Sequence, residues 1–559
     1  RGCRHAMRVS LLDYGAGNVR SLINALEKLG FEIEFITSPE QIATAQVLLF
    51  PGVGSFGQCM QVLREKNYEE ALRQYVKADR PFLGICLGMQ SLFASSEESP
   101  GVKGLCVIDC PVQRFTTSEL AVPQIGWNGV MPRKPSAMFG SYSADAGGDA
   151  VYFVHSYRVP DLPAVAEWAL CHTDYGAERY ISGVQRGRVA AVQFHPEKSG
   201  EVGLAMLRNF LSEALTPGSV PCLQPSPSAG GTSATRCCKR VIACLDVRAN
   251  DNGDLVVTKG DQYDVRGGGD VRNLGKPVSL AQRYYDEGAD EVTFLNITGF
   301  RDCPLTDLPM LKVLQEASRT CFVPLTVGGG IRQFTDAQGV EHNALEVASA
   351  YFRAGADKIS IGGDAVEAAR ALLAGRAPDG STAIEQISHV YGRQAVVVSV
   401  DPRRVWVESE ADAAGHALAD HGAAEVDIGV RGPKGERLCW YECTVQGGRK
   451  GSDIDVVQLA TSVERLGAGE LLVNCIDNDG QNAGYDLPLL LSIKAAVSVP
   501  VIASSGAGAP EHFSKVFERT NVEAALAASI FHHKKVAIDA VKVHLHARGI
   551  SARRAGPPA

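Results

Sequence analysis

The stretch Phe82-Leu83-Gly84-Ile85-Cys86-Leu87-Gly88 places a cysteine between a short apolar run and a helix-like run. A Gly-x-Cys-x-Gly turn there has the form of a nucleophile elbow, because small flanking residues let the chain turn sharply and expose one side chain above a parallel sheet. Short apolar runs such as 9–12 and 47–50 alternate with helix-period stretches such as 18–29. This alternation predicts a doubly wound α/β domain with Cys86 as its candidate nucleophile.

A thiol at an elbow needs a base, and Phe194-His195-Pro196-Glu197 supplies a candidate. Residues two apart share a face of an extended segment, so Glu197 can orient His195 while His195 deprotonates Cys86. The sequence therefore predicts a Cys-His-Glu triad. The alternative is a buried apolar cysteine, the commonest fate of a lone Cys, but the downstream His-Pro-Glu favours the triad.

With these motifs in place, the N-terminal part of the chain resembles class I glutamine amidotransferase domains. By this resemblance Gly52 and Gly54 belong to the oxyanion loop, whose backbone N–H groups face the tetrahedral oxygen, and Gln90 holds the substrate glutamine. The runs Asp13-Tyr14-Gly15-Ala16-Gly17-Asn18 and Phe153-Val154-His155-Ser156-Tyr157 narrow the match to the glutaminase subunits of imidazole glycerol phosphate synthases.

Composition places the chain among soluble globular enzymes. Its 559 residues suffice for two or three domains, and 45% apolar and 21% charged residues are ordinary values. A formal net charge of −8 gives no reason to expect nucleic acid, and no apolar run is long enough for a membrane span. The 15 cysteines are dispersed without metal-ligand spacing, so no metal is expected. A reactive thiol implies a reducing compartment, the cytoplasm or the plastid stroma.

Three segments follow from the pattern. We expect the glutaminase domain over residues 7–216, and a Pro-, Gly- and Ser-rich linker over 217–236. A second α/β stretch, 237–559, is long enough for a (β/α)8 TIM barrel with insertions.

The second stretch repeats itself, since Val241-Ile242-Ala243-Cys244-Leu245-Asp246 is echoed by Val396-Val397-Val398-Ser399-Val400-Asp401. Both aspartates end apolar runs, which places them at the C-terminal rim of barrel strands and, in a half-barrel repeat, across the mouth from each other. Two facing carboxyls suit paired general acid and general base work. The alternative, a helix N-cap, is favoured for one such Asp but not for two in register.

Two glycine clusters are also echoed, Gly328-Gly329-Gly330 and Gly506-Ala507-Gly508. Each follows a strand-like run and can direct backbone N–H groups at an anion, as phosphate sites in such barrels do. Either alone is a weak signal. Two in matching halves predict a substrate with a phosphate at each end.

These motifs resemble the cyclase subunits of imidazole glycerol phosphate synthases. The resemblance implies that ammonia from glutamine attacks PRFAR, a bis-phosphorylated ribulosyl formimino aminoimidazole carboxamide ribotide, to give imidazole glycerol phosphate and AICAR without a cofactor. It implies that Asp246 and Asp401 are the catalytic acid and base, and that Lys259 closes over the substrate. The expected phosphate sites are Gly330, Gly362 and Gly363 on one side and Asp479, Gly480, Gly508, Ala528 and Ser529 on the other.

Some positions depart from the bacterial pattern of that family: Asn296 replaces an aspartate, Gly363 a threonine and Ser505 a glycine. Like the fused arrangement, these departures resemble the single-chain enzymes of fungi and plants. They make the individual phosphate contacts less predictable than the reaction. The chain is also longer than that pattern over three stretches, 246–259, 333–351 and 403–441.

A route for ammonia is expected along the barrel axis, because ammonium formed in water has no lone pair with which to attack. Arg240 and Asp246 have the same parity on one strand and lie about 20 Å apart at roughly 3.3 Å per residue. By the resemblance, Arg240, Glu291, Lys358 and Glu470 form a ring of gating charges on the barrel floor. The alternative is that these buried charges only satisfy one another and stabilise the barrel.

The resemblance also pairs Lys198, beside the triad, with Asp357 on the barrel floor, so an ion pair is expected between the two domains. The sequence thus predicts a glutamine-dependent synthase working as a single fused chain on glutamine and PRFAR. One alternative is a glutaminase fused to a related isomerase-type barrel, which needs no ammonia. The other is a non-catalytic scaffold, against which the intact triad and aspartates argue.

Overall fold

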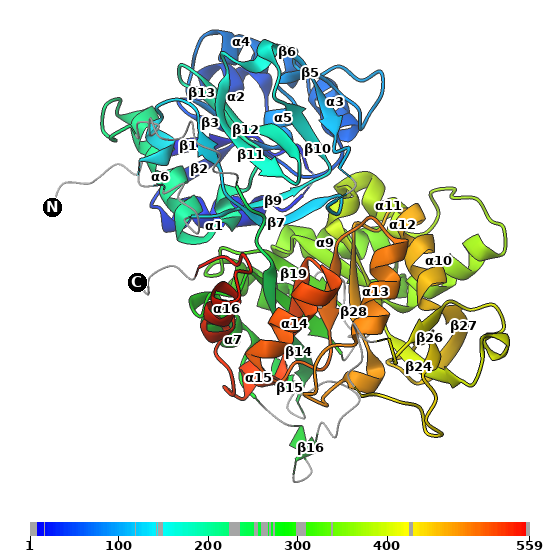
Figure 1. Ribbon diagram of the computed structural model, residues 1–559. Helices are drawn as coiled ribbons and strands as arrows, with labels where there is room; N and C mark the ends of the chain where they lie inside the picture. The colour runs from blue at the N-terminus through cyan, green and yellow to red at the C-terminus, as the bar shows by residue number, and fades with distance from the viewer. Residues whose placement is uncertain are drawn as a thin grey trace.

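The structure is a computed structural model that consists of two α/β units, the N-terminal one above and the C-terminal one below in Figure 1. Within the described part of the chain, no helix has the length and apolarity needed to cross a membrane. The described residues are 8–15, 17–117, 119–140, 142, 149–222, 235–250, 255–258, 266–267, 270–271, 274–297, 309–336, 339–423 and 429–554.

The N-terminal unit is built on a sheet with the strand order β2-β1-β3-β4-β13-β12-β10-β6-β5. Its first five strands run parallel, and β3 and β4 are buried along their whole length. Such continuous apolar strands require helices on both faces, and two separate apolar clusters are present. The strands are β1 (Arg8–Leu11), β2 (Glu32–Phe35), β3 (Leu48–Gly52), β4 (Phe82–Cys86), β5 (Phe93–Ser96), β6 (Ile108–Arg114), β10 (Tyr157–Pro160), β12 (Glu178–Arg186) and β13 (Val189–Val192).

Helices cover this sheet, and short strands extend it. The strands β8 (Met131–Pro132) and β11 (Ala169–Tyr175) are added next to β12. This arrangement confirms the predicted doubly wound α/β domain. The helices are α1 (Val19–Lys28), α2 (Pro39–Thr44), α3 (Phe56–Glu65), α4 (Tyr68–Lys77), α5 (Leu87–Gln90) and α6 (Gly200–Leu215).

A two-stranded ribbon, β7 (Gln124–Asn128) and β9 (Val151–His155), lies between the units (Figure 1). Its residues Ile125, Trp127 and Tyr152 belong to the same buried apolar cluster as the C-terminal unit. The two units therefore share a core at this point.

The C-terminal unit is a closed barrel of eight parallel strands, in which β14 pairs with both β18 and β30. The predicted (β/α)8 barrel is confirmed. Its strands are β14 (Arg240–Ala249), β18 (Glu291–Asn296), β19 (Leu325–Gly328), β22 (Lys358–Ile361), β23 (Val396–Val400), β28 (Glu470–Asn474), β29 (Val501–Ser504) and β30 (Ala524–Ala527). Its helices are α7 (Pro277–Asp286), α8 (Pro309–Ser318), α9 (Ala344–Ala354), α10 (Gly363–Leu373), α11 (Ala383–Tyr391), α12 (Val456–Leu466), α13 (Leu487–Ala496), α14 (Pro510–Thr520), α15 (Ser529–His532) and α16 (Ile538–Ala547).

One strand boundary differs from the expectation. Asp401 directly follows β23, as predicted, whereas Asp246 lies inside β14, which continues to Ala249. The extension is stabilised by an antiparallel partner, β15 (Leu255–Thr258), with Asp246 opposite Thr258. The expectation that the strand ends at Asp246 was wrong because this hairpin carries it beyond the rim of the barrel.

Small antiparallel elements occupy the three stretches of extra length. Besides β15, they include the ribbon β20 (Phe334–Thr335) and β21 (Glu341–His342). A further pair, β16 (Arg266–Gly267) and β17 (Asp270–Val271), lies outside these stretches. The largest addition is a four-stranded sheet between β23 and α12 (Figure 1). Its strands are β24 (Pro402–Val407), β25 (Leu418–Asp420), β26 (Leu438–Val445) and β27 (Lys450–Asp455).

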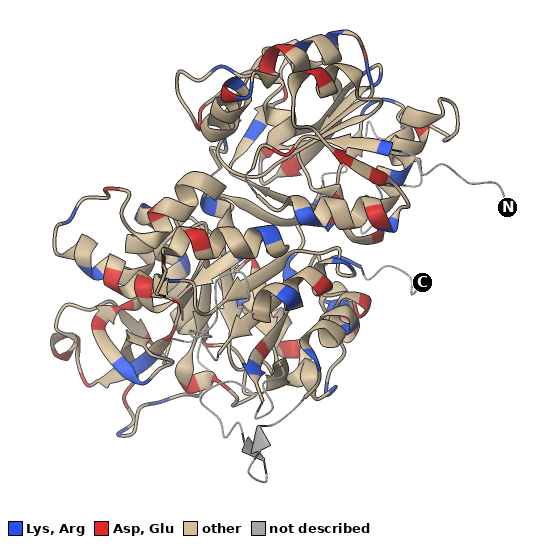
Figure 2. Cartoon of the chain, turned by 180° about the vertical axis from the view of Figure 1, so that it is seen from behind, with Lys and Arg blue, Asp and Glu red and all other residues tan. Residues whose placement is uncertain are grey.

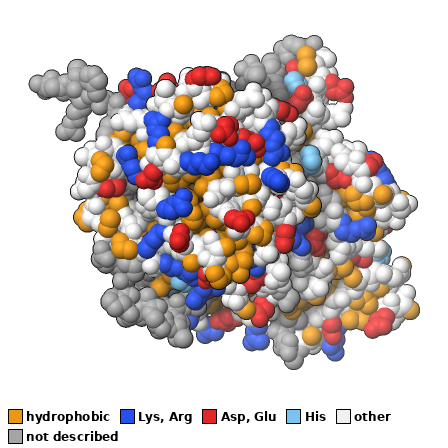
Figure 3. All heavy atoms as spheres, turned by 90° about the horizontal axis from the view of Figure 1, so that it is seen from above, with side chains coloured by type: hydrophobic (Ala, Val, Ile, Leu, Met, Phe, Trp, Pro, Cys, Tyr) orange, Lys and Arg blue, Asp and Glu red, His pale blue; other side chains and the backbone are white. Residues whose placement is uncertain are grey.

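Charged side chains of both signs are spread over the two units. Figure 2 shows Lys and Arg interspersed with Asp and Glu on the face in view. From above the N-terminal unit, acidic, basic and apolar side chains are intermixed (Figure 3). Neither view shows, for the described residues, the continuous basic face typical of nucleic-acid binding.

Candidate active sites

Cys86 sits at a strained elbow between β4 and α5. Its φ of +54° is in a region that non-glycine residues rarely adopt. A Cβ on Gly84 would lie 2.7 Å from the carbonyl oxygen of Gly88, and a Cβ on Gly88 would lie 1.9 Å from that of Phe50. Both flanking positions therefore require glycine, and the turn presents the thiol at the end of the parallel strand.

The end of β13 brings a histidine and a glutamate to this thiol. His195 Nδ1 lies 2.7 Å from Glu197 Oε1, and both side chains are about 5% exposed. Burial alone would lower the pKa of His195, but the Glu197 carboxylate and the Cys86 sulfur outweigh it and raise this pKa well above its usual value. Gln193 Nε2 also donates to Cys86 Sγ at 3.5 Å. The structure brings the three predicted triad residues together.

The expected oxyanion loop follows β3 and faces the elbow. A Cβ on Gly52 would approach Leu87 Cβ to 2.7 Å, and Gly54 has a φ of +127°. The Tyr14 hydroxyl donates to the carbonyl oxygen of Val53 at 2.5 Å. The loop is thus packed against the first residue after the nucleophile, with its central peptide fixed by a buried tyrosine.

Gln90, which is predicted to hold the substrate glutamine, is itself fixed by hydrogen bonds. Its Nε2 donates to the carbonyl oxygen of Tyr157 at 3.1 Å and to Gln193 Oε1 at 2.9 Å. Gln193 in turn bonds the Cys86 sulfur, so Gln90 belongs to a buried network that positions the thiol.

The sequence reasoning missed Glu98. Burial raises the pKa of this carboxyl to about 7, against the bond that Glu98 Oε2 accepts from the N–H of Phe56 at 2.7 Å. Within the described residues no lysine, arginine or histidine lies within ion-pair distance of it. Nearby is a groove of about 450 Å³ whose walls include Ser99 beside Glu98, Ser55 after the oxyanion loop, and His389 of α11. Glu98 follows β5 in a Ser-rich stretch that has no recognisable motif.

The two barrel aspartates lie on opposite sides of the mouth, because β14 and β23 are four strands apart in the closed order of eight. Asp401 Oδ1 accepts hydrogen bonds from Asn474 Nδ2 at 2.9 Å and from Ser399 Oγ at 3.4 Å. Burial raises the pKa of Asp401 despite these bonds. Asp246 lines a cavity of about 80 Å³ at the same rim.

Most residues of one expected phosphate site line that cavity with Asp246: Asp479, Gly480, Ala528 and Ser529. Gly508 is not among its lining residues. Instead, Gly508 packs so closely that a Cβ would lie 2.3 Å from the carbonyl oxygen of Asn482. Ser505 lines the cavity with a φ of +71°, so it keeps a glycine-like conformation.

The other expected phosphate site lies at the ends of the adjacent strands β19 and β22. Gly330 has a φ of +77°, Gly362 is the N-cap of α10, and Gly363 is the first residue of that helix. Open space surrounds each of them where a side chain would start. Asn296 is buried at the end of the neighbouring β18. Lys259, the predicted closing residue, lies outside the described residues.

The four expected gate residues start four barrel strands and meet in one fully buried cluster. Arg240 bonds Glu291 at 2.9 Å and also bonds Glu470, while Lys358 Nζ lies 2.8 Å from Glu291 and 2.6 Å from Glu470. Arg240 and Lys358 outweigh the effect of burial on Glu470 and lower its pKa. The cluster is electrically neutral and closes the end of the barrel opposite the aspartates.

The N-terminal unit meets this end of the barrel through an ion pair. Lys198 Nζ lies 2.6 Å from Asp357 Oδ2, and the two side chains are 3% and 15% exposed. Asn18 Nδ2 donates to Asp357 Oδ1 at 2.8 Å, and Trp127 Nε1 donates to the carbonyl oxygen of Asp290 at 3.1 Å. The thiol site therefore faces the barrel floor.

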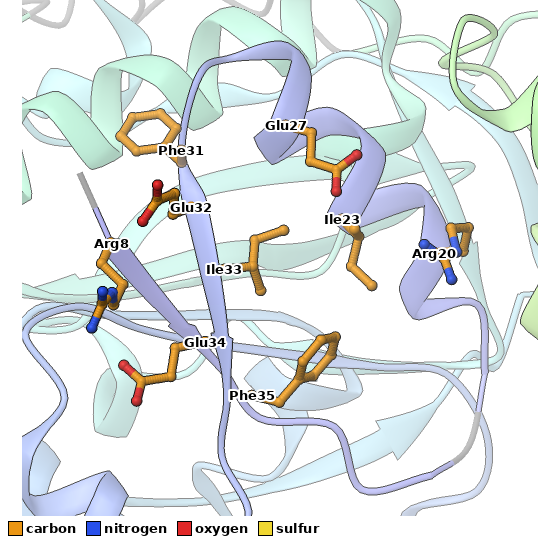
Figure 4. Close-up of a pocket in the computed structure, with 9 residues that line it drawn as sticks. All are labelled: Arg8, Arg20, Ile23, Glu27, Phe31, Glu32, Ile33, Glu34 and Phe35. Atoms are coloured by element: carbon orange, nitrogen blue, oxygen red, sulfur yellow. The ribbon is translucent and has the colours of Figure 1, made fainter. Parts of the chain in front are cut away.

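A separate groove of about 710 Å³ lies between α1 and the edge strand β2 (Figure 4). Ile23 of α1 and Ile33 and Phe35 of β2 line it, together with charged residues such as Arg8. None of the predicted site residues is among them. Among the described residues, no group of three His, Cys, Asp or Glu side chains is placed to hold a metal ion.

Comparisons with known proteins match both units. Residues 10–214 match the family described as glutamine amidotransferase class-I, and residues 240–537 match the family described as histidine biosynthesis protein. The "Imidazole glycerol phosphate synthase hisHF, chloroplastic" of Arabidopsis thaliana is 55% identical over 549 residues, 98% of this chain and 89% of that protein. The chain belongs to the imidazole glycerol phosphate synthase family.

Two further relatives show which parts of the chain correspond to the fused protein and to the separate subunit. The "Imidazole glycerol phosphate synthase hisHF" of Emericella nidulans is 49% identical over 560 residues, 98% of this chain and 99% of that protein. The "Imidazole glycerol phosphate synthase subunit HisF" of Natronomonas pharaonis is 40% identical over 315 residues, 56% of this chain and 98% of that protein. The chain thus has the fused arrangement of hisHF relatives, while HisF relatives match one part of it.

Proposed function

We propose that the chain hydrolyses glutamine at Cys86 and passes the ammonia through the barrel to PRFAR, giving glutamate, imidazole glycerol phosphate and AICAR. One observation supports this most: a Cys-His-Glu set in one unit faces the charged floor of a barrel whose opposite rim carries two half-buried aspartates. Membership in the family supports the same reaction.

In the proposed glutaminase step, the Cys86 thiol gives its proton to His195 Nε2 and the thiolate attacks the carboxamide carbon of glutamine. His195 Nε2 is buried, and Glu197 and the Cys86 sulfur together raise the pKa of His195, which favours holding this proton on the imidazole. N–H groups of the loop at Gly52 and Gly54 stabilise the oxyanion. The proton on His195 then leaves with the amide nitrogen as ammonia, and water hydrolyses the thioester to glutamate.

We assign Glu98 to the α-ammonium group of glutamine. A carboxyl that burial holds at a pKa of about 7 gains most from a cation, because the cation compensates for the lost solvation. A groove next to this carboxyl is lined by Ser55 and Ser99 of the N-terminal unit and by His389 of the barrel.

In the proposed cyclase step, Asp246 and Asp401 exchange protons with opposite sides of one substrate, with a phosphate bound near each. The raised pKa of Asp401 suits a group that must hold a proton part of the time. The cavity that Asp246 shares with Gly480 and Ser529 supplies backbone and hydroxyl donors for one phosphate.

The proposed ammonia route crosses the ring at Arg240. Arg240 Nε and the hydroxyl of Tyr152 are buried there without hydrogen-bond partners among the described residues, so both can bond a passing ammonia molecule. The ring is closed by its own ion pairs. Passage therefore requires that one of these pairs opens.

The test is to incubate the protein with PRFAR and either glutamine or an ammonium salt. The proposal predicts AICAR with both nitrogen sources. An isomerase-type barrel fused to a glutaminase gives none, and a non-catalytic scaffold also lacks glutaminase activity.

For the compartment we propose the plastid stroma, with the cytoplasm as the alternative. The Arabidopsis relative is named chloroplastic, and a reactive Cys86 needs reducing surroundings. A fluorescent fusion to the full-length protein, observed in its own cells, distinguishes the two.

A further inference from the structure

The inserted sheet β24–β27 is fixed to the strand end that carries Asp401. Its first strand begins at Pro402, the next residue. Thr444 of β26 donates to the carbonyl oxygen of Asp401 from its N–H at 3.0 Å and from its hydroxyl at 2.7 Å. The insertion is therefore part of the barrel mouth.

Arg404 is the residue through which this sheet reaches the next loop. Its side chain is 7% exposed, and its Nε donates to Asp486 Oδ2 at 2.9 Å. Its Nη2 donates to the same oxygen and to Asn478 Oδ1, the latter at 2.5 Å. Its backbone N–H donates to Asp477 Oδ2 at 2.7 Å. One residue thus binds both ends of the loop 475–486.

This loop forms one wall of the cavity that contains Asp246. Asn478 Nδ2 donates to the carbonyl oxygen of Gly484 at 3.0 Å, which closes the loop on itself. The N–H of Gly484 donates to the carbonyl oxygen of Gly506 at 2.8 Å, which joins it to the neighbouring glycine turn. Its residues that line the cavity are Asp479, Gly480 and Asn482.

The far end of the loop is anchored by a buried carboxylate. Asp486 is 1% exposed, and its Oδ1 accepts bonds from the Tyr441 hydroxyl at 2.6 Å and from the N–H of Leu489 at 3.1 Å. Arg404 is the cation that pairs with it. A buried ion pair satisfied in this way fixes geometry more than it adds stability.

We propose that Arg404 is a positioning residue for substrate phosphate: it holds the loop 475–486 in the shape that receives one phosphate and ties that loop to the strand end of Asp401. The inference rests on the proposed cyclase function. Arg404 bonds none of the residues that line the cavity, so it acts through Asn478 and Asp486. Its replacement weakens substrate binding more than it slows the chemical step.

The test uses the full chain with saturating ammonium, so that the glutaminase unit is not involved, and follows AICAR formation as PRFAR is varied. Arg404→Lys keeps the charge, but a lysine cannot bond Asp486 and Asn478 in the same fork. Asn478→Ala leaves the Arg404–Asp486 pair and removes the link from Arg404 to Asn478, together with the bond from Asn478 to the carbonyl oxygen of Gly484. We expect each to raise KM for PRFAR about tenfold or more and to change kcat less than about threefold, as for lost charge-assisted bonds.

Arg403→Gln is the matched control. Arg403 is the preceding residue of the same strand, is 43% exposed, and its Nε bonds Glu442 Oε2 at 2.8 Å instead of the loop. Its KM should stay within about twofold of wild type, because its pair with Glu442 makes no bond to the loop 475–486. Glutaminase activity without PRFAR should be the same in all variants.

An unchanged KM in both Arg404→Lys and Asn478→Ala overturns the inference, as does a loss confined to kcat. If Arg404→Lys does not fold, an unchanged KM in Asn478→Ala is enough to overturn the inference. If wild type and Arg403→Gln form no AICAR, the proposed function fails instead, so the two failures are distinguishable.

Discussion

At the scale of single residues, the conformation of the predicted nucleophile, Cys86, depends on two neighbouring glycines that have no side chain. Cys86 can hold its φ of +54° because Gly84 and Gly88 leave room for the close approach of neighbouring carbonyl groups. The pKa of Glu98 depends instead on burial, which raises it to about 7 beside the expected oxyanion loop.

Gly88→Ala should destabilise the N-terminal unit, because its Cβ would lie 1.9 Å from the carbonyl oxygen of Phe50. An overpacked backbone contact of this kind costs about 3 kcal/mol or more. Urea unfolding measures this loss of stability. The control, Gly363→Ala, places its Cβ in open space at the start of α10 and should change stability by less than about 1 kcal/mol. Equal stability of both variants would contradict the close packing.

Glu98→Gln should change the pH dependence of stability. The folded pKa of about 7 lies above the ordinary value of 4.5, so the folded protein binds the extra proton between these values. Proton binding by Glu98 therefore contributes fully to the stability of the wild type below about pH 4.5, and this contribution is lost as the pH rises through about 7. Relative to wild type, the variant should gain stability between pH 5 and pH 8. Parallel unfolding curves at both pH values would exclude the raised pKa.

Binding of glutamine should change as well. In the proposed role only the ionised Glu98 binds the α-ammonium group, so kcat/KM for glutamine should rise with pH through about 7 in the wild type. In Glu98→Gln, kcat/KM should no longer rise with pH in this range. At pH 8, KM for glutamine should be roughly tenfold or more above that of the wild type, as for one lost bond to a charged group.

At the scale of elements, the sequence predicted what periodicity and local turn chemistry determine. The runs around Cys86 and Asp401 form strands β4 and β23, and the strand starts at Arg240 and Glu291 are where the pattern put them. The overrun of β14 past Asp246 could not be predicted, because it depends on pairing with β15.

The sites were predictable to a similar degree. Cys86 and His195 were predicted as nucleophile and base because such residues lie in local motifs, and the structure places them together. Glu98 was missed because the role proposed for it rests on the tertiary burial of a glutamate that lies in no motif. The contacts of Arg404 also join segments 73 to 82 residues apart, which periodicity cannot reveal.

The opposed strands β14 and β23 give a prediction at this scale. Asp246→Asn should reduce AICAR formation by about a hundredfold or more with glutamine and with ammonium alike, as for loss of a general acid or base. Glutaminase activity without PRFAR should remain. Steady-state assays with each nitrogen source check this, and full activity with ammonium would remove Asp246 from the reaction.

At the scale of the whole molecule, the two units are joined so that the thiol site faces the closed end of the barrel. The shared core around Trp127 and Tyr152 and the pair Lys198–Asp357 fix this orientation. The neutral ring at Arg240 then lies between the thiol site and the aspartates.

Lys198→Met should uncouple the units, because it leaves Asp357 buried without its cation. Glutamine-dependent AICAR formation should fall about tenfold or more, whereas turnover with ammonium stays within about twofold. The ratio of glutamate to AICAR formed measures how much of the released ammonia escapes into the solvent. A ratio that stays at one would show that the pair has no part in transfer.

The central claim is that nitrogen released at Cys86 reaches Asp246 and Asp401 without mixing with the solvent. The direct measurement supplies glutamine with an isotopically labelled amide together with excess unlabelled ammonium, near neutral pH, and determines the label in imidazole glycerol phosphate. The account predicts that the product carries the label of the glutamine amide. Dilution of the label to the proportion in the bulk solution would contradict it.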